Sequence, residues 1–215
     1  LAATHKFVTP KSTIQVATWN VRTGYHVDQL KIIAGELSRY KISITALSEL
    51  RLTESGIRTV SIPGSDDKMT FLYSGGDKHI EGVGFTLDQR AAKSVTAFQP
   101  LSSRLAILTL SGTVRTHVFS VYAPTEVSPD DSKDDFYAQL QDALDTVPRT
   151  DLIIIAGDLN ARVGADRSGW ESTLGRFGLG KANDNGVRLL SLATANGLTV
   201  GNTFFRHSLK HQLTW

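Results

Sequence analysis

The 215-residue sequence contains no cysteine. This absence excludes disulfides, zinc sites built on thiolates and a cysteine nucleophile. The sequence also lacks a run of about 18 consecutive apolar residues, which a transmembrane helix would need, and residues 1–9 lack the apolar core of a signal peptide. We therefore expect an intracellular protein, nuclear or cytoplasmic, with no membrane partner.

A large excess of either charge is missing too. Lys and Arg number 23 against 21 Asp and Glu, which gives a net charge of +2 and does not by itself indicate a nucleic-acid partner. The last quarter is more basic, because residues 157–215 carry seven Lys or Arg and four Asp or Glu. A modest basic rim of this kind fits a polyanionic substrate, although ordinary scatter of surface charge explains it equally well.

Length and hydrophobic spacing predict one α/β domain over residues 13–215, after a flexible lead of residues 1–12. Apolar residues at helical spacing predict helices over residues 27–40, 129–147 and 186–196. Ser128 and Asn185 are the expected N-caps of the last two helices. Strands are expected over residues 14–19, 41–47, 57–62, 69–73, 81–87, 94–99, 104–110, 115–121, 152–156, 198–205 and 213–215. This order favours two mixed β-sheets packed face to face, with helices outside.

Polar side chains follow four of these strands at the point where each strand ends. They are Asn20, Glu49, Tyr122, Asp158 and Asn160. Because ligands of open α/β sheets bind at the carboxyl ends of strands, we expect these side chains to share one pocket. An oxygen-rich pocket suits a hard divalent cation such as Mg²⁺ and the hydrolysis of phosphoesters.

Each of these residue types has a role in such chemistry. Glu49 can bind Mg²⁺ directly, and Asp158 is the expected base for an attacking water. Asn20 and Asn160 can fix the carboxylates and donate to phosphate oxygens, while Tyr122 can donate its proton. Structural roles stay open: Asn20 could cap a turn, Glu49 could be a solvated strand end, and Tyr122 could belong to the core.

The motifs around these residues resemble the endonuclease/exonuclease/phosphatase superfamily, which includes deoxyribonuclease I, the apurinic/apyrimidinic endonucleases and the endonuclease domains of non-LTR (LINE-type) retrotransposons. The segments that carry the resemblance occur in the same order at residues 18–22, 47–49, 121–125 and 157–161. Three further segments are most similar to the retrotransposon branch, at residues 183–186, 201–204 and 213–215.

The resemblance implies a four-layer α/β sandwich like that of deoxyribonuclease I, and a hydrolase dependent on Mg²⁺, with Mn²⁺ as a possible substitute. It implies that Asn20 and Glu49 hold the metal. It places Asp158 and Asn160 at the scissile phosphate with Tyr122 beside it, and it makes Thr214 a further catalytic residue. The residues that it assigns to a nucleic-acid groove are Arg22, Thr125, Arg162, Asn185 and Asn202.

These implications favour an endonuclease that nicks DNA at a retrotransposon target site, with a reverse transcriptase as the expected partner domain. The family's later Asp and Ser-Asp-His segments do not occur before Trp215, so we expect this chain alone to be inactive or weakly active. Thr125 stands where abasic-site enzymes carry Asn, which disfavours an abasic-site specialist. Two alternatives stay open: a phosphatase for small phosphoesters from the same superfamily, and a non-catalytic remnant that binds nucleic acid.

Overall fold

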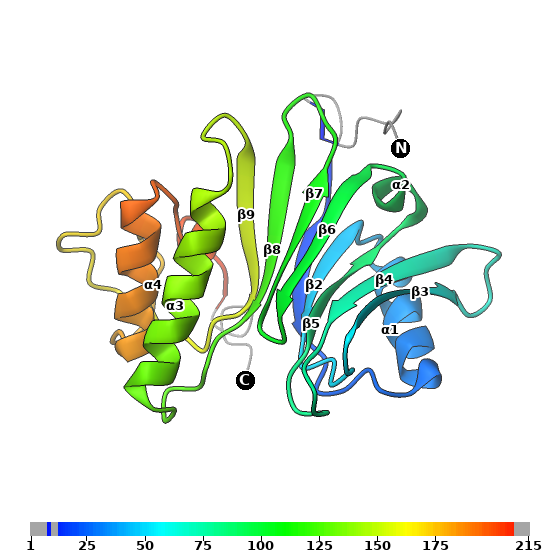
Figure 1. Ribbon diagram of the computed structural model, residues 1–215. Helices are drawn as coiled ribbons and strands as arrows, with labels where there is room; N and C mark the ends of the chain where they lie inside the picture. Colours follow the sequence, from blue (N-terminus) through cyan, green and yellow to red (C-terminus); the bar gives the residue numbers. More distant parts are fainter. Residues whose placement is uncertain (1–7, 10–12, 209–215) are drawn as a thin grey trace. The chain divides into compact units, whose positions relative to one another are not determined.

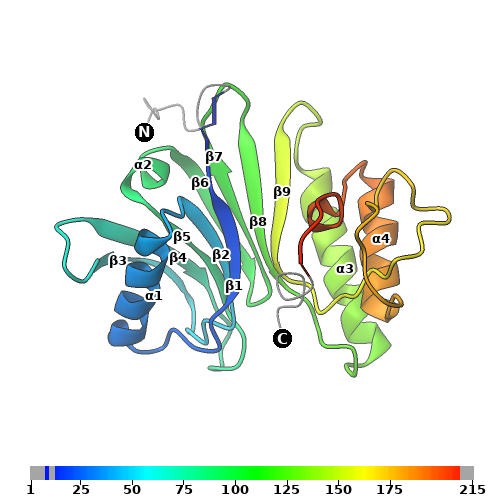
Figure 2. The same ribbon diagram turned by 180° about the vertical axis from the view of Figure 1, so that it is seen from behind.

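The computed structural model describes residues 8–9 and 13–208 (Figures 1 and 2). Contacts divide the chain into two compact units, one formed by residues 1–123 and 143–158, the other by residues 124–142 and 159–215. The single domain expected over residues 13–215 stays a prediction. In the expected lead, Val8 forms an isolated parallel bridge with Gly112. No helix in the described part of the chain is long and apolar enough to cross a membrane.

The first unit contains a five-stranded sheet with the order β1-β2-β5-β4-β3. Its strands are β1 (Val16–Asn20), β2 (Ile44–Ser48), β3 (Ser55–Ser61), β4 (Lys68–Ser74) and β5 (Val83–Leu87). β1 and β2 run parallel, and the other pairs are antiparallel. Every residue of β2 and β5 is buried, as expected for central strands that are covered on both faces.

A four-stranded sheet with the order β6-β7-β8-β9 completes the core of this unit. Its strands are β6 (Val95–Ser102), β7 (Leu105–Leu110), β8 (Thr116–Tyr122) and β9 (Leu152–Asp158). Only β8 and β9 are parallel, so both sheets are mixed, as the sequence predicted. The parallel pairs place Asn20 beside Ser48 in one sheet, and Tyr122 beside Asp158 in the other, at the carboxyl ends of their strands.

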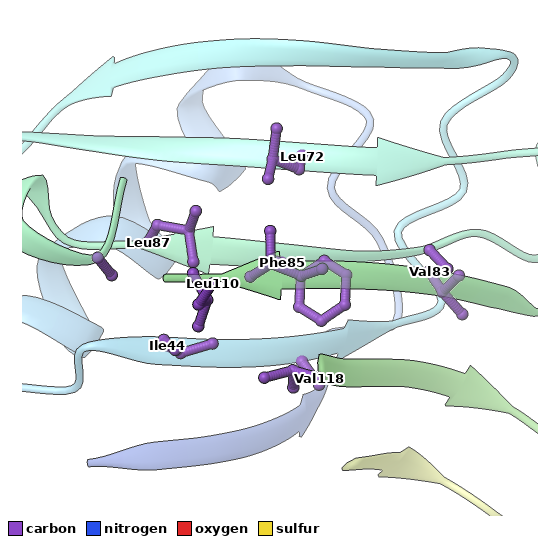
Figure 3. Close-up of a cluster of buried hydrophobic side chains, with 11 residues drawn as sticks. Ile44, Leu72, Val83, Phe85, Leu87, Leu110 and Val118 are labelled. Carbon is purple, nitrogen blue, oxygen red and sulfur yellow. The ribbon is translucent and has the colours of Figure 1, made fainter. Parts of the chain in front are cut away.

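The two sheets pack face to face through one apolar core (Figure 3). Phe85 and Leu87 of β5 meet Leu110 of β7 and Val118 of β8 in this cluster. The Ser120 hydroxyl donates a hydrogen bond to the carbonyl of Leu47, at 3.1 Å, and thereby joins the sheets directly. The core therefore fixes the ends of β1 and β2 relative to the ends of β8 and β9.

Helix α1 (Val27–Arg39) covers the other face of the first sheet. Its buried side recurs at helical spacing, as the sequence indicated, with Leu30, Ile33, Ala34 and Leu37 packed against residues of β2, β3 and β4. One short helix, α2 (Gln89–Ala92), follows β5 where the sequence indicated neither a helix nor a strand. It forms because the Asp88 carboxylate accepts a hydrogen bond from the Ala91 N–H at 2.6 Å.

The second unit contains most of α3 (Asp130–Asp145), α4 (Asp184–Ala195) and the 3₁₀ turn η1 (Gly201–Thr203). Helix α4 begins two residues earlier than predicted. Asn183, and not Asn185, is its N-cap, and the Asn183 Oδ1 accepts from the Gly186 N–H at 2.8 Å. The asparagine two residues before the predicted cap therefore has the capping role.

The predicted strand over residues 198–205 is wrong. Val200 makes only an isolated bridge with Leu174, and η1 follows at once. The Thr203 hydroxyl explains the turn, because it donates to the Val200 carbonyl at 2.6 Å and accepts from the Gly175 N–H at 2.7 Å. A side chain that bonds nearby backbone competes with an extended strand. The strand expected at residues 213–215 lies outside the described residues.

Candidate active site

Four of the side chains expected to share a pocket lie together in the first unit. The Nδ2 of Asn20 donates to Glu49 Oε1 at 2.8 Å and to Asp158 Oδ2 at 3.0 Å. The Tyr122 hydroxyl donates to the same Glu49 oxygen at 3.2 Å. One amide nitrogen thus stands between two carboxylates that are 109 positions apart in the sequence. We call Asn20, Glu49, Tyr122 and Asp158 the carboxylate cluster.

The backbone around the carboxylate cluster is strained. Glu49 and Arg51 have φ angles of 54° and 55°, and Arg22 has a φ of 58°. Residues other than glycine rarely adopt this left-handed conformation, and those that do are enriched at functional sites. The Arg22 N–H donates to the Asn20 Oδ1 at 3.1 Å, so this turn also sets the direction of the Asn20 amide.

The Glu49 carboxylate accepts hydrogen bonds from three side chains, Asn20, Tyr122 and Arg51. Burial alone would raise its pKa, but hydrogen bonds from Asn20, Arg51 and Tyr122 and the positive charge of Arg51 outweigh burial and lower the pKa. The Arg51 guanidinium lies 3.0 Å from Glu49 Oε2. Glu49 is therefore held as a carboxylate, the form that binds a cation.

Charged groups also surround Tyr122. Burial is the main cause that raises the pKa of its hydroxyl, and the negative charge of Glu49 adds to it, so the phenol keeps its proton. Arg104 lies over the Tyr122 ring, 5.1 Å from its centre, and donates to the Tyr122 carbonyl at 3.0 Å. The Arg104 guanidinium also forms an ion pair with Glu81 at 2.6 Å.

Sequence reasoning missed Arg51 and Arg104. A signal for Arg51 existed, because it follows Glu49 by two residues, the same spacing by which Arg22 follows Asn20. Arg104 carries no such signal, because it lies in the turn between β6 and β7 and reaches Tyr122 only through the fold.

Replacing Arg51 with glutamine is expected to raise the pKa of Glu49, since the hydrogen bond and the charge of Arg51 both lower it. The stabilisation from a lowered carboxyl pKa is present above the unfolded value and is lost as the pH falls through the folded value. In the variant, the pH below which this stabilisation is lost should therefore be higher. Titration of the Glu49 side-chain carbon by NMR measures the pKa, and Arg58→Gln is the control, because Arg58 contacts the Tyr73 ring. An unchanged Glu49 pKa would contradict the ion pair.

The donor set of the carboxylate cluster fits a hard divalent cation. Glu49 and Asp158 offer carboxylate oxygens on either side of one amide, and Mg²⁺ is commonly held by one or two carboxylates together with water. Asn20 fits less directly as a ligand. Its nitrogen faces both carboxylates, while its oxygen accepts from Arg22, so Asn20 would have to rotate its amide to bind a metal. Its metal-binding role stays a prediction.

Of the other predicted site residues, Arg22 lies in the first unit, Thr214 lies outside the described residues, and the rest fall in the second unit. Asn160 has a φ of 47° and is partly buried. Thr125, Arg162 and Asn202 are exposed, as a nucleic-acid contact requires. Asn185 is not, because its side chain is fully buried, and the predicted place in a groove is corrected for this residue.

Comparison with known proteins gives one family and one fold. Residues 17–213 match the Endonuclease/Exonuclease/phosphatase family. Craniofacial development protein 2 from Tragulus javanicus and from Bos taurus is 30% identical over 203 residues, which are 93% of this chain. The matched regions are 34% and 33% of those proteins, so the chain spans about a third of the length of these curated relatives.

Solved structures show the same fold at low identity. An AP endonuclease from Leishmania major, LMAP, aligns with a TM-score of 0.54 and 11% identity over 90% of this chain and 72% of that chain. The Xenopus laevis APE2 catalytic domain aligns with a TM-score of 0.51 and 16% identity, over 81% of this chain and 66% of that chain. An AP endonuclease from Archaeoglobus fulgidus aligns with a TM-score of 0.50 and 19% identity, over 71% of this chain and 59% of that chain. The predicted class of two mixed sheets with helices, like deoxyribonuclease I, is confirmed.

Proposed function

Because the chain belongs to the Endonuclease/Exonuclease/phosphatase family, we propose that it is a metal-dependent endonuclease that hydrolyses one strand of DNA. Family membership supports a hydrolase of the nuclease or phosphodiesterase type. The observation that carries the finer proposal is the single Asn20 amide that bonds both the Glu49 and the Asp158 carboxylate. Two fixed carboxylates at strand ends can divide the work of holding a cation and of accepting a proton.

The side chains of the carboxylate cluster have separate tasks in this proposal. Asp158 accepts the proton of the attacking water, and Asn20 keeps that carboxylate oriented. Glu49 would hold the cation. The Tyr122 hydroxyl donates a hydrogen bond to Glu49, and in the complex with substrate it can donate to a phosphate oxygen instead. When bound, Mg²⁺ supplies positive charge that stabilises the phosphate oxygens and the leaving oxygen. Asn160, two residues after Asp158, donates to the phosphate.

Exposed arginines favour a polyanionic substrate over a small phosphoester. Arg22 follows Asn20 by two residues and Arg51 follows Glu49 by two, and both are exposed. Phosphate contacts from such arginines position a nucleic acid without reading its sequence. The proposal includes nicking at a retrotransposon target site and a reverse transcriptase as partner domain; the relatives' greater length leaves room for further domains.

Supercoiled-plasmid nicking tests the proposed activity. We expect the full-length gene product to convert supercoiled plasmid to open circles with Mg²⁺ or Mn²⁺ and to lose this activity in EDTA. A small phosphoester serves as the control substrate, and we expect it to be hydrolysed much more slowly than DNA. Nicking that survives EDTA would contradict the metal. Hydrolysis of the small phosphoester without any nicking would indicate a phosphatase and not an endonuclease. DNA binding without turnover would indicate a non-catalytic remnant.

A further inference from the structure

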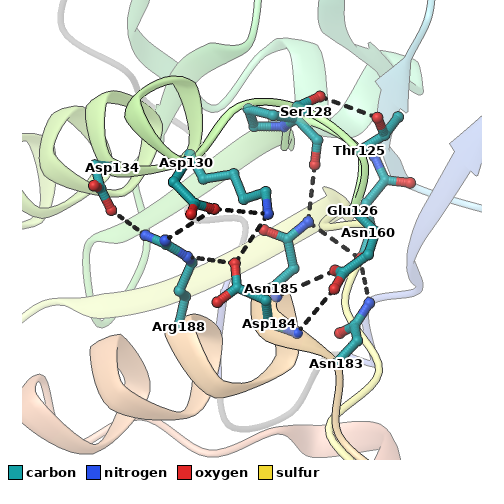
Figure 4. Close-up of polar contacts among 12 residues, drawn as sticks. Thr125, Glu126, Ser128, Asp130, Asp134, Asn160, Asn183, Asp184, Asn185 and Arg188 are labelled. Carbon is teal, nitrogen blue, oxygen red and sulfur yellow. Dashed lines mark hydrogen bonds and ion pairs between the residues drawn. The ribbon is translucent and has the colours of Figure 1, made fainter.

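The Asn160 carbonyl is held by two asparagine side chains from the start of α4 (Figure 4). The Nδ2 atoms of Asn183 and Asn185 both donate to this oxygen, each at 3.3 Å. Asn185 also donates to the Pro124 carbonyl at 2.9 Å. Asn160 itself has a φ of 47°, in the left-handed region that among residues with a side chain asparagine adopts most readily.

The chain beyond Asn160 is fastened to the same helix end. The Asn183 Oδ1 accepts from the Arg162 N–H at 2.8 Å, and the Asn183 N–H donates to the Arg162 carbonyl at 3.0 Å. Gly186 permits this approach, because a Cβ there would lie 1.8 Å from the Arg162 carbonyl oxygen. Asn160 is therefore held directly through its carbonyl and indirectly through Arg162.

The start of α4 is itself held by several polar contacts within the second unit (Figure 4). The Glu126 carboxylate accepts from the N–H groups of Asp184 and Asn185, at 3.1 and 3.4 Å. The ammonium of Lys133, whose side chain is only 5% exposed, bridges Asp184 and Asp130. Arg188 bonds Asp184 as well, at 2.8 Å. Acidic residues at the starts of α3 and α4 thus have structural partners, and these contacts hold the helix end that carries the two asparagines.

Asn185 combines a buried side chain with specific hydrogen bonds from its amide nitrogen. Its side chain is fully buried, and its Oδ1 has no hydrogen-bond partner among the described residues. A buried polar atom without a partner lowers stability, whereas the hydrogen bonds from Nδ2 satisfy the carbonyls of Pro124 and Asn160. The two bonds from its Nδ2 are what an apolar residue could not supply.

We propose that Asn183 and Asn185 are positioning residues that hold the backbone of Asn160 in its left-handed conformation, and with it the side chain that the proposed function assigns to the scissile phosphate. The second half of this statement rests on the proposed function, in which Asn160 contacts that phosphate. The first half concerns the backbone alone. Asn185 therefore acts through Asn160 and does not touch nucleic acid.

Asn183→Asp is the sharpest test, because aspartate keeps the oxygen that caps α4 and bonds Arg162 but cannot donate to the Asn160 carbonyl. Asn185→Ala removes the second donor. Tyr137→Phe is the matched control: the Tyr137 hydroxyl donates to the Asn185 carbonyl at 3.0 Å, so its loss weakens the same helix end without touching Asn160. Thermal melts establish that each variant is folded.

Two measurements read the result. NMR backbone ¹³C shifts and the HN–Hα coupling of Asn160 report its φ, and we expect both to leave left-handed values in Asn183→Asp and Asn185→Ala but not in Tyr137→Phe. Nicking by the full-length gene product should show kcat about tenfold to a hundredfold lower in the same two variants, as for other residues that orient a catalytic group, with KM little changed. In an Asn160→Ala background, either substitution should lower kcat no further.

The two measurements separate this inference from the proposed function. If the wild-type protein does not nick DNA, the endonuclease proposal fails, and the NMR result alone then decides whether the asparagines hold Asn160. An unchanged Asn160 backbone in both variants overturns the positioning role. A rise in KM at constant kcat overturns it as well, because that result would mean that the asparagines contribute to DNA binding.

Discussion

Asp158→Asn is expected to lower the turnover number for DNA nicking about 10²–10⁴-fold, the usual contribution of a general base. Asparagine matches aspartate in shape, and its oxygen can still accept the hydrogen bond from the Asn20 amide. It cannot take a proton from water at neutral pH. The variant should therefore fold normally and bind DNA while it fails to cut. Single-turnover nicking of supercoiled plasmid, beside a DNA-binding titration, measures both properties.

Asp151→Asn supplies the control for this experiment. Asp151 stands immediately before the other end of β9 and bonds His117 at 2.9 Å. The hydrogen bond from His117 lowers the pKa of Asp151, so its loss affects folding stability in the pH range where the aspartate is charged. Nicking by the folded variant should stay near the wild-type rate. A wild-type rate in Asp158→Asn as well would remove Asp158 from the chemistry and leave Glu49 as the next candidate base.

Gly157→Ala is expected to destabilise the protein by more than about 4 kcal/mol, which is exceptional for one methyl group. Gly157 has a φ of 138°, and a Cβ would lie 2.0 Å from the Val121 carbonyl oxygen of the neighbouring strand. The clash between this Cβ and the Val121 carbonyl can be relieved only if β8 and β9 separate. These strands carry Tyr122 and Asp158 at their ends. Equilibrium unfolding in urea measures the loss, and poor recovery of folded protein would be its extreme form.

Gly64→Ala separates the two causes of that loss. Gly64 also has a positive φ, 75°, but a Cβ added there would meet no atom within 4 Å. Its replacement should cost about 1–2 kcal/mol, the usual penalty of a left-handed residue. If Gly157→Ala costs no more than Gly64→Ala, the close approach to Val121 is not what requires glycine, and β8 can adjust without cost.

The sequence alone was enough to predict the class of two mixed sheets and the four strand ends that carry the carboxylate cluster. Runs of apolar residues that stop on Asn20, Glu49, Tyr122 and Asp158 mark both where a strand ends and what it carries. Parallel pairing then brings such ends to one edge of each sheet, so the carboxylate cluster follows from a local pattern. The buried face of α1 was predictable for the same reason, because the spacing of its apolar residues is itself the signal.

Tertiary structure decided how individual polar groups are used. Nothing near Asn185 in the sequence shows that it is buried under Pro124 and Asn160, because those partners are 61 and 25 positions away. Residues 198–205 have the composition of a strand, yet Thr203 turns the chain through a bond to Gly175. Asn20 faces the carboxylates with its nitrogen because Arg22 takes its oxygen. The spacing of hydrophobic residues can be read within a single segment of the sequence. The partner of a hydrogen bond, in contrast, depends on which distant backbone groups the fold brings within reach.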